Sequence, residues 1–396
     1  MDEQVRMLSE LKAKLESVTR SPTTKKVFVG FDGFVDKIMK AVRQKKNFET
    51  IYFATVRDFA ARINSASGKI GQIELVNQRV KLGGNGPILS NTLGKLGVQS
   101  FCAGALGYPD RHDVFSKMDS KCELISLQNP GESSAIEFED GKIILSELSV
   151  FNEYDWKFVK NSSHLERIKK AVLASSIVAF VDWVNLPNAS DIWEGVLDEI
   201  IKPSGRKNFY FLFDLCDPSK KTDEQIDEIL DVISSFSPYG KVTLGLNENE
   251  TLRIWCAING VDYNSPSERD RIPSVRSAGN ALYKTMNIDC LLVHPTDRTI
   301  VFRQHEIVEL QGRLVTNPKV LTGGGDNLNA GYCLGLLNEL SLQHCMLLGM
   351  ATSGAYIQNG ITPDVKSIID YIQVWIEELG LKQADKPDHV FAHRHE

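Results

Sequence analysis

Leu321-Thr322-Gly323-Gly324-Gly325-Asp326-Asn327 is the most informative stretch of this chain, because three glycines run directly into an acidic residue. Glycine has no Cβ, so its backbone can adopt positive φ and its N–H groups can approach an anion closely. The start of a helix adds unpaired N–H groups and a partial positive charge. The stretch therefore predicts an anion-binding site, with Asp326 at the cap or in the first turn of a helix.

Apolar residues follow Asp326 at the three- and four-residue spacing of a helix with one buried stripe, namely Ala330, Cys333, Leu334, Leu337 and Leu340. A carboxylate at this point, beside a bound phosphate, is placed to accept a proton from an attacking hydroxyl. An aspartate is also an ordinary helix-capping residue, and that interpretation would be preferred for a single Gly-Asp pair. Three glycines and a long apolar helix favour the functional interpretation.

The composition is that of an ordinary globular protein, with 396 residues, of which 42% are hydrophobic and 24% charged. We expect a single α/β domain over residues 1–396. The formal charge of -6 gives no basic surface, so nucleic acid is not expected as a partner. The seven scattered cysteines form no Cys-x-x-Cys pair, which fits reduced thiols in the cytoplasm. The apolar runs are too short to span a bilayer, so no membrane segment is expected.

Short β-rich runs alternate with helical patterns along the chain, namely Val27–Phe31, Ser176–Val181, Phe209–Phe213, Val242–Leu246 and Cys290–Val293. Because these runs are apolar at successive positions, they resemble strands buried on both faces. The alternation predicts a mainly parallel sheet with helices on both sides.

Three regions instead show strand followed by strand, at about residues 38–50, 70–81 and 122–147. Within the last of them, Ser134–Glu139 and Lys142–Glu147 flank Asp140-Gly141, which predicts a two-residue hairpin turn with positive φ. We expect these regions to form a small β-sheet that covers the α/β body.

Two further glycine-rich segments are candidates for ligand binding. Lys81-Leu82-Gly83-Gly84-Asn85-Gly86-Pro87 predicts a tight turn before a helix, where a polyhydroxylated ligand can meet the backbone. Gly30–Asp36 lies at the end of the first strand, where open α/β sheets gather ligand-binding residues. Asp32 and Asp36 have two interpretations of about equal weight, as acceptors for sugar hydroxyls and as turn-forming or capping residues.

Asn247 and Glu250 follow another strand and share one face of the predicted helix. The pair suits a hydrated Mg²⁺, which prefers oxygen ligands and retains water. It equally suits a capping box, and the two interpretations are compatible. The chain lacks a Walker loop, the dinucleotide-binding fingerprint and a Gly-x-Ser-x-Gly elbow, so the classes of protein that these motifs mark are not favoured.

Taken in chain order, these motifs resemble those of the ribokinase-like carbohydrate kinases, often called the PfkB family. The similarity spans roughly residues 27–380, is strongest from Thr322 to Gly331, and includes the small-residue run Gly349–Ala355. The resemblance implies a three-layer α/β/α fold with a mainly parallel central sheet and a small β-sheet lid. In this family the lid can also pair two subunits, so a homodimer is an expected assembly.

The resemblance also implies a reaction, the transfer of the terminal phosphate of a nucleotide to a sugar hydroxyl. Asp326 would be the catalytic base, and Gly323, Gly324 and Gly325 would form the anion hole. The implied sugar contacts are Asp36, Asp32, Gly83, Gly84 and Asn85. The implied nucleotide contacts are Asn247, Glu250, His294, Thr322 and Gly354, with Mg²⁺ held by Glu250 and by Asn247 through water.

Three features depart from the family pattern. Gly-Gly-Gly-Asp replaces the usual Gly-Ala-Gly-Asp, a small change that preserves the anion hole. The Gly30–Asp36 spacing is one residue longer than in typical ribokinases, and Leu292–Arg298 replaces the usual Thr-x-Gly turn. Both of these features are similar to the ADP-dependent sugar kinases. The expected co-substrate is ATP, with ADP as the alternative; a silent sugar- or nucleotide-binding relative and a nucleoside kinase are the other functions considered.

Overall fold

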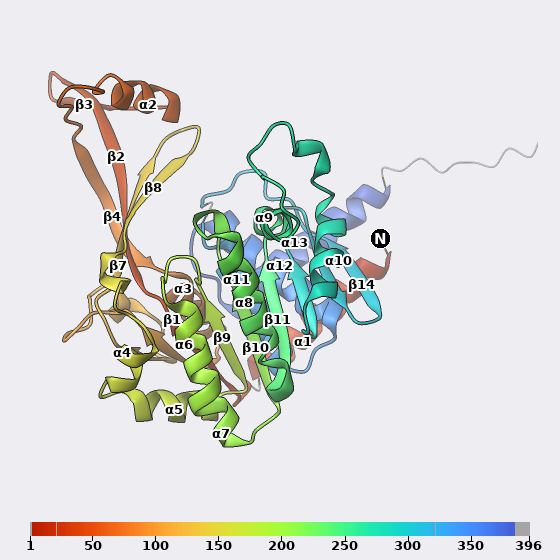
Figure 1. The fold of residues 1–396 in the computed structure, drawn as a ribbon. Helices are drawn as coiled ribbons and strands as arrows, with labels where there is room; N and C mark the ends of the chain where they lie inside the picture. The colour runs from red at the N-terminus through yellow and green to blue at the C-terminus, as the bar shows by residue number, and fades with distance from the viewer. Residues whose placement is uncertain (1, 21, 321, 385–396) are drawn as a thin grey trace, which may run out of the picture.

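The computed structural model describes residues 2–20, 22–320 and 322–384; Leu321, the first residue of the glycine-rich stretch, lies outside them. Its centre is a nine-stranded sheet with the order β14-β13-β12-β11-β10-β9-β1-β5-β6 (Figure 1). In that order the strands span Glu306–Gln311, Arg298–Arg303, Cys290–Val293, Gly240–Leu246, Phe209–Asp214, Ile177–Val181, Lys26–Phe31, Gln99–Gly104 and Cys122–Ser126. The pairings from β12 to β6 are parallel, and β13 and β14 add an antiparallel edge. The mainly parallel sheet and the five predicted strands are confirmed.

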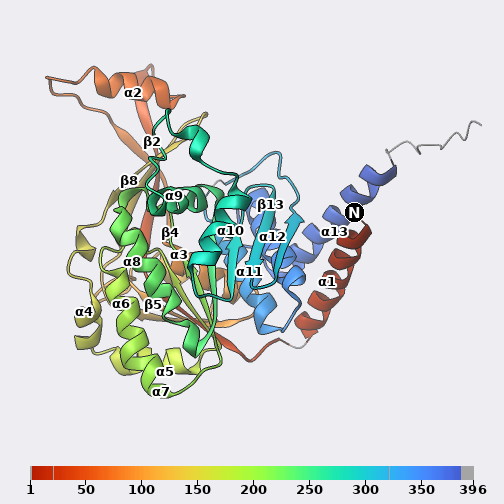
Figure 2. The same ribbon diagram turned by 45° about the vertical axis from the view of Figure 1, so that its right-hand side comes forward.

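Helices cover both faces of this sheet (Figure 2). One layer contains α1 (Asp2–Arg20), α3 (Asn85–Lys95), α11 (Gly324–Leu337), α12 (Leu342–Asn359) and α13 (Val365–Ala384). The other contains α4 (Trp156–Asn161), α5 (Leu165–Ala174), α6 (Ala189–Val196), α8 (Asp223–Ser234), α9 (Glu248–Ile258) and α10 (Val275–Thr285), with the short α7 (Lys202–Ser204). None of the helices in the described part of the chain is both long and apolar enough to cross a membrane.

The three layers follow from the alternation of side chains along each strand. In β9, Val178 and Phe180 belong to the core beneath the α5–α10 layer, whereas Ile177 and Ala179 belong to the core beneath the α11–α13 layer. All four side chains are fully buried. A strand that is apolar at successive positions is therefore buried on both faces, as the sequence pattern predicts.

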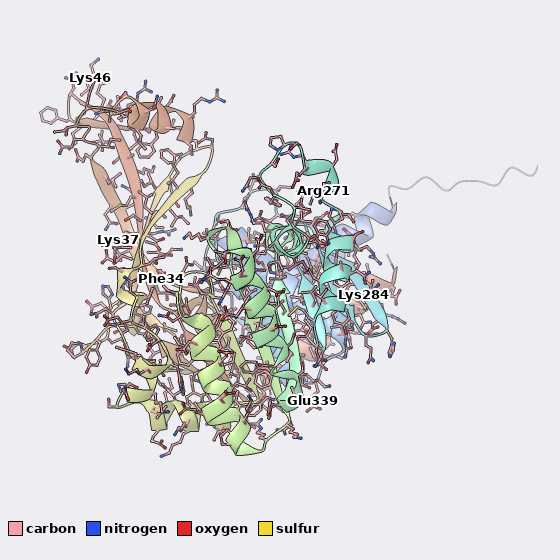
Figure 3. The ribbon with its side chains drawn as sticks, in the orientation of Figure 1. Phe34, Lys37, Lys46, Arg271, Lys284 and Glu339 are labelled. Atoms are coloured by element: carbon pink, nitrogen blue, oxygen red, sulfur yellow. The ribbon has the colours of Figure 1, made fainter. Side chains whose placement is uncertain are left out.

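A second sheet projects from the body and forms the lid (Figures 1 and 2). Its strands are β2 (Phe34–Lys46), β3 (Glu49–Tyr52), β4 (Leu75–Gly83), β7 (Gly131–Glu137) and β8 (Lys142–Glu147). Helix α2 (Val56–Asn64) lies at its far end. Figure 3 shows Phe34 and Lys37 near the base of the lid and Lys46 at its tip.

Two details of the predicted lid are wrong. Residues 122–126, expected in the lid, form β6, which pairs with β5 at the edge of the main sheet. The connection between β5 and β6 contains no crossover helix, only a single 3-10 turn at Phe115–Lys117, so the sequence reads as strand following strand. The β7–β8 hairpin is confirmed, but its register pairs Glu137 with Lys142, and neither Asp140 nor Gly141 has positive φ. The turn instead lies one residue earlier, at Glu139 and Asp140, since the Phe138 N–H donates to the Gly141 carbonyl at 2.9 Å.

Candidate active site

A cavity of about 560 Å³ lies at the carboxyl ends of the central strands. Residues after β10, β11 and β12 line it, together with the start of α11, as expected for an open α/β sheet. Nine of the predicted site residues meet there: Asn85, Asn247, Glu250, His294, Gly323, Gly324, Gly325, Asp326 and Gly354. The other predicted residues, Asp32, Asp36, Gly83, Gly84 and Thr322, are not part of its lining.

The glycine-rich loop ends in a helix start, as predicted. Gly323 is the N-cap of α11 with φ 84°, a conformation that glycine adopts without strain. The backbone N–H of Asn327 donates to the Gly323 carbonyl at 3.2 Å, so the preceding N–H groups have no partner within the helix. Asp326 lies in the first turn. The start of α11 thus offers N–H groups and positive dipole to an anion in the cavity.

Asp326 is buried, and its Oδ1 atom has no hydrogen-bond partner. Burial raises the pKa of this carboxyl well above its usual range, and the carboxylates of Asp214, Asp32 and Asp182 raise it further. A hydrogen bond from the Asn85 side chain acts in the opposite direction. Asp326 therefore binds protons strongly, a property suited to a group that accepts one.

Asn85 provides a test of the predicted catalytic role of Asp326, through the pH dependence of turnover. Because its hydrogen bond lowers the pKa of Asp326, an Asn85→Leu variant should have a still higher pKa at that carboxyl. Fewer molecules then carry an ionised Asp326 at a given pH, so the acidic limb of the kcat/KM profile should move to higher pH. The profiles of the unaltered enzyme and of Asn338→Leu, altered at the far end of α11, should coincide. An unshifted limb in Asn85→Leu would contradict this interpretation.

The second glycine pair brings two aspartates against the backbone. Gly84, the N-cap of α3, has φ 89°, and a Cβ there would lie 2.5 Å from Asp32 Oδ2. A Cβ at Gly83 would lie 2.2 Å from Asp36 Oδ1. Asp32 accepts the backbone N–H of Gly86 at 2.8 Å, so it contacts the first turn of α3 from the end of β1, and its Oδ2 atom has no partner among the described residues. Asp36 is half-buried on the lid strand β2, 3.9 Å from Lys81 on β4.

Asn247 and Glu250 form the predicted capping box at the start of α9. Glu250 accepts from the backbone N–H of Asn247 at 2.8 Å and from its side-chain amide at 2.7 Å, and its own N–H donates to Asn247 Oδ1 at 2.9 Å. Burial raises the pKa of Glu250 to about 8, and the carboxylate of Asp214 contributes. These three hydrogen bonds hold the pair in a fixed arrangement near the carboxylate of Asp214.

His294 and Gly354 also line the cavity, and they contribute different properties to it. Burial lowers the pKa of His294 to about 4, so the ring is neutral near neutral pH, and its Nε2 atom has no partner. The ring lies beside the anion site, because a Cβ at Gly325 would be 3.6 Å from His294 Cε1. A Cβ at Gly354 would be 2.1 Å from the hydroxyl of Tyr371, so this glycine also permits α12 and α13 to pack.

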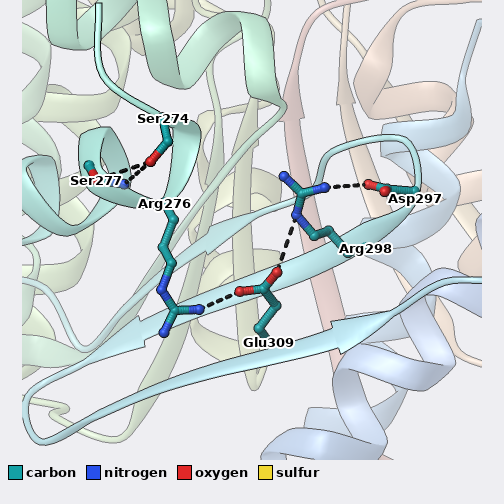
Figure 4. A network of polar contacts seen from close by, with 6 residues as sticks. All are labelled: Ser274, Arg276, Ser277, Asp297, Arg298 and Glu309. Carbon is teal, nitrogen blue, oxygen red and sulfur yellow. Dashed lines mark hydrogen bonds and ion pairs between the residues drawn. The ribbon is translucent and has the colours of Figure 1, made fainter.

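Arg298 places a positive charge in the cavity lining, and Figure 4 shows how it is held. Its guanidinium contacts Asp297 at 2.8 Å and Glu309 at 3.3 Å. Glu309 also pairs with Arg276 from α10. The network fixes Arg298 at the start of β13, on the antiparallel edge of the sheet.

Sequence reasoning did not assign site roles to two buried aspartates, Asp182 and Asp214. Asp182 has φ 59° and accepts from Asn185 at 2.7 Å, and Asp214 accepts from Asn329 at 2.7 Å. Burial raises the pKa of Asp214 to about 6. Both residues lie at the carboxyl end of a buried strand, as Asp32 does. The same signal, applied to β9 and β10, would have found them.

Comparison with known proteins gives the family. The model of the prokaryotic ketohexokinase family matches residues 2–375. A ketohexokinase from Haloferax volcanii is 23% identical over 346 residues, covering 85% of this chain and 88% of that protein. The adenosine kinase of Sinorhizobium meliloti has a TM-score of 0.61 at 17% identity, covering 89% of this chain and 99% of its own. The Arabidopsis thaliana ribokinase, solved with ribose and ATP, has a TM-score of 0.57 at 15% identity, covering 88% and 98%.

At these identities the two solved structures show the fold alone, which is the three-layer ribokinase-like fold expected from the motifs. The family model reaches further, because its match covers nearly the whole chain. This chain therefore belongs to the prokaryotic ketohexokinase family and is a ribokinase-like carbohydrate kinase of the PfkB type, a phosphotransferase that acts on a sugar hydroxyl.

Proposed function

We propose that this protein transfers the terminal phosphate of ATP to a hydroxyl of a ketohexose, with Asp326 as the general base. The observation that carries the proposal is the position of Asp326, a buried carboxylate with an unpartnered oxygen in the first turn of α11. The hydroxyl loses its proton to Asp326 as its oxygen attacks the phosphorus in line. Negative charge on the phosphoryl oxygens is stabilised by the N–H groups that follow Gly323.

The residues on the acceptor and donor sides have separate roles in this proposal. The sugar is contacted by Asp36, Gly83, Gly84 and Asn85. Asp32 supports these residues through its hydrogen bond to the start of α3. Asn247, Glu250, His294, Thr322 and Gly354 serve the nucleotide. The relatives support ATP as the donor, since the Arabidopsis ribokinase was solved with it. The neutral ring of His294 donates or accepts one hydrogen bond at the phosphates without adding charge.

The oxygen atoms of Asn247 and Glu250 suit a Mg²⁺ ion held through water. Among the described residues, no three His, Cys, Asp or Glu side chains are grouped so that they could hold a metal ion. Asn247 and Glu250 nevertheless present oxygen atoms near Asp214, and burial together with the Asp214 carboxylate raises the pKa of Glu250, an effect that a nearby cation would oppose. When bound, Mg²⁺ would neutralise charge on the phosphates.

A coupled phosphorylation assay tests the proposed function directly. The purified protein is offered ketohexoses, aldoses and nucleosides, each with ATP and, in parallel, with ADP. We expect turnover of a ketohexose with ATP. Turnover of nucleosides alone would identify a nucleoside kinase, and turnover with ADP alone would overturn the donor. Sugar and nucleotide binding without any product would identify a silent binding protein.

We also propose that two copies associate through the lid. The last strand of the lid sheet, β8, is at a free edge and exposes Ile144 and Leu145. An exposed apolar edge strand is a template for pairing with a second chain. An Ile144→Glu, Leu145→Glu variant should be a monomer by light scattering under conditions in which the unaltered protein is a dimer. Leu173→Glu, an exposed change on α5, should leave the dimer intact. A monomeric unaltered protein would contradict the proposal.

A further inference from the structure

A second cavity, of about 400 Å³, lies where the lid strand β4 meets the body beside α3 and α12. Its lining contains four cationic side chains, Arg79, Lys81, Lys95 and Lys117, and no acidic side chain. The remaining lining includes three polar side chains, Asn91, Tyr356 and Thr362. The volume is within the range of small-ligand sites. The charge of this cavity is thus opposite to that of the carboxylate-rich active site.

The positive charge of this cavity is only partly compensated by neighbouring acids. Lys81 lies 3.9 Å from Asp36, and Lys95 lies 3.6 Å from Asp119. Arg79 and Lys117 form no side-chain hydrogen bond and no ion pair with any residue of the described chain. Arg79, on the lid strand β4, and Lys117, on the body, are both exposed and are therefore available to an anion in this cavity.

Tyr356 connects this cavity to the active site. It lines the cationic cavity, and its hydroxyl would be 3.1 Å from a Cβ placed at Gly323, the N-cap of α11. The pKa of the Tyr356 phenol responds to both sites. Burial raises it most, the carboxylate of Asp326 raises it further, and Arg79 lowers it. Lys81 is paired in register with Asp36, which the proposed function places on the sugar. The cavity therefore adjoins the acceptor side of the site.

We propose that the cavity lined by Arg79, Lys81, Lys95 and Lys117 binds a phosphoryl group. A phosphate dianion matches two uncompensated cations better than a carboxylate does, and arginine can hold it with two parallel hydrogen bonds. The group can belong to a sugar phosphate or be free inorganic phosphate. Binding of a sugar phosphate rests on the proposed function, because the sugar would then extend toward Asp36. Binding of inorganic phosphate does not rest on it.

Binding is measured by calorimetry with two probes, inorganic phosphate and fructose 6-phosphate. The test variant is Arg79→Glu, Lys117→Glu, and Arg79→Gln, Lys117→Gln serves if charge reversal impairs folding. The matched control is Arg271→Glu, Lys284→Glu, which has the same change in net charge; Figure 3 shows both residues on the body, away from the lid. We expect the Kd of the bound anion to rise at least about tenfold in the test variant and to stay unchanged in the control. High ionic strength should weaken binding to the unaltered protein.

The outcomes separate the two sources and the two proposals. Loss of fructose 6-phosphate binding in the test variant supports the site with a sugar phosphate as its ligand, and loss of inorganic phosphate binding alone supports it with free phosphate. If neither probe binds the unaltered protein, or if binding is equal in the test and control variants, the inference is overturned. The phosphorylation assay with neutral ketohexoses fails or succeeds independently of this result, so failure of the proposed function is recognised separately.

Discussion

An Asp326→Asn variant is expected to phosphorylate a ketohexose about 10²–10⁴-fold more slowly than the unaltered enzyme, because general-base catalysis contributes a factor of roughly that size. Asparagine keeps the shape of the side chain and can accept a hydrogen bond, but it cannot take the proton of the attacking hydroxyl. The loss should appear in kcat, with the KM values of sugar and nucleotide changed little. The measurement is a full set of steady-state constants for both substrates.

The same substitution should leave the fold intact, which separates catalysis from stability. The pKa of Asp326 is higher in the folded chain than in the unfolded chain, so the unfolded chain releases this proton at lower pH. Above the unfolded pKa the folded state binds more protons, and stability falls as the pH rises. Asparagine removes this dependence, so the Tm of the variant near neutral pH should equal or exceed that of the unaltered protein.

Asp223→Asn is the matched control for this experiment, because Asp223 also lies in the first turn of a helix but is exposed on α8. It should retain full activity. A folded Asp326→Asn variant with unaltered turnover would show that another group accepts the proton.

The sequence was sufficient for the parts of the site that depend on local backbone chemistry. The start of α11 after Gly323 and the capping box of Asn247 and Glu250 were predicted because glycine conformation, unpaired N–H groups and capping are properties of a few consecutive residues. The buried strands were predicted for the same reason, since burial on both faces requires an uninterrupted apolar run.

What the sequence could not give are the contacts between distant segments. The carboxylates of Asp32, Asp182 and Asp214 surround Asp326 only because β1, β9 and β10 are neighbours in the sheet. The sequence pattern placed the residues of β6 in the lid, whereas they pair with β5. That pairing depends on both strands, so the residues of β6 alone do not reveal it. The position of Arg79 beside Tyr356 likewise depends on where β4 meets α12. Strand order and register are set by tertiary packing, which a local pattern does not encode.

The second large effect is expected at the acceptor side, where an Asp36→Asn variant should raise the KM for the sugar about tenfold to a hundredfold while kcat stays within a few-fold. A hydrogen bond from a sugar hydroxyl to a carboxylate contributes about 1.5–3 kcal/mol, and about 1.4 kcal/mol corresponds to a factor of ten. In the proposed function, Asp36 acts in sugar binding and does not touch the transferred phosphoryl group. The effect should therefore fall on KM, whereas that of Asp326→Asn falls on kcat.

The ionisation of Asp36 adds a second signature to that experiment. Burial raises its pKa, and Lys81 and Lys142 lower it. Because the carboxylate is the stronger acceptor, sugar binding to the unaltered enzyme should tighten as the pH rises through this pKa. The amide that replaces the carboxylate in Asp36→Asn does not titrate, so the variant should lose that dependence. Asp58→Asn, an exposed change on the lid helix α2, is the matched control and should keep both the KM and its pH dependence. An unchanged KM in Asp36→Asn would mean that the lid strand β2 does not contact the sugar, and that the acceptor is held by Asn85 and the backbone of Gly83 and Gly84 alone.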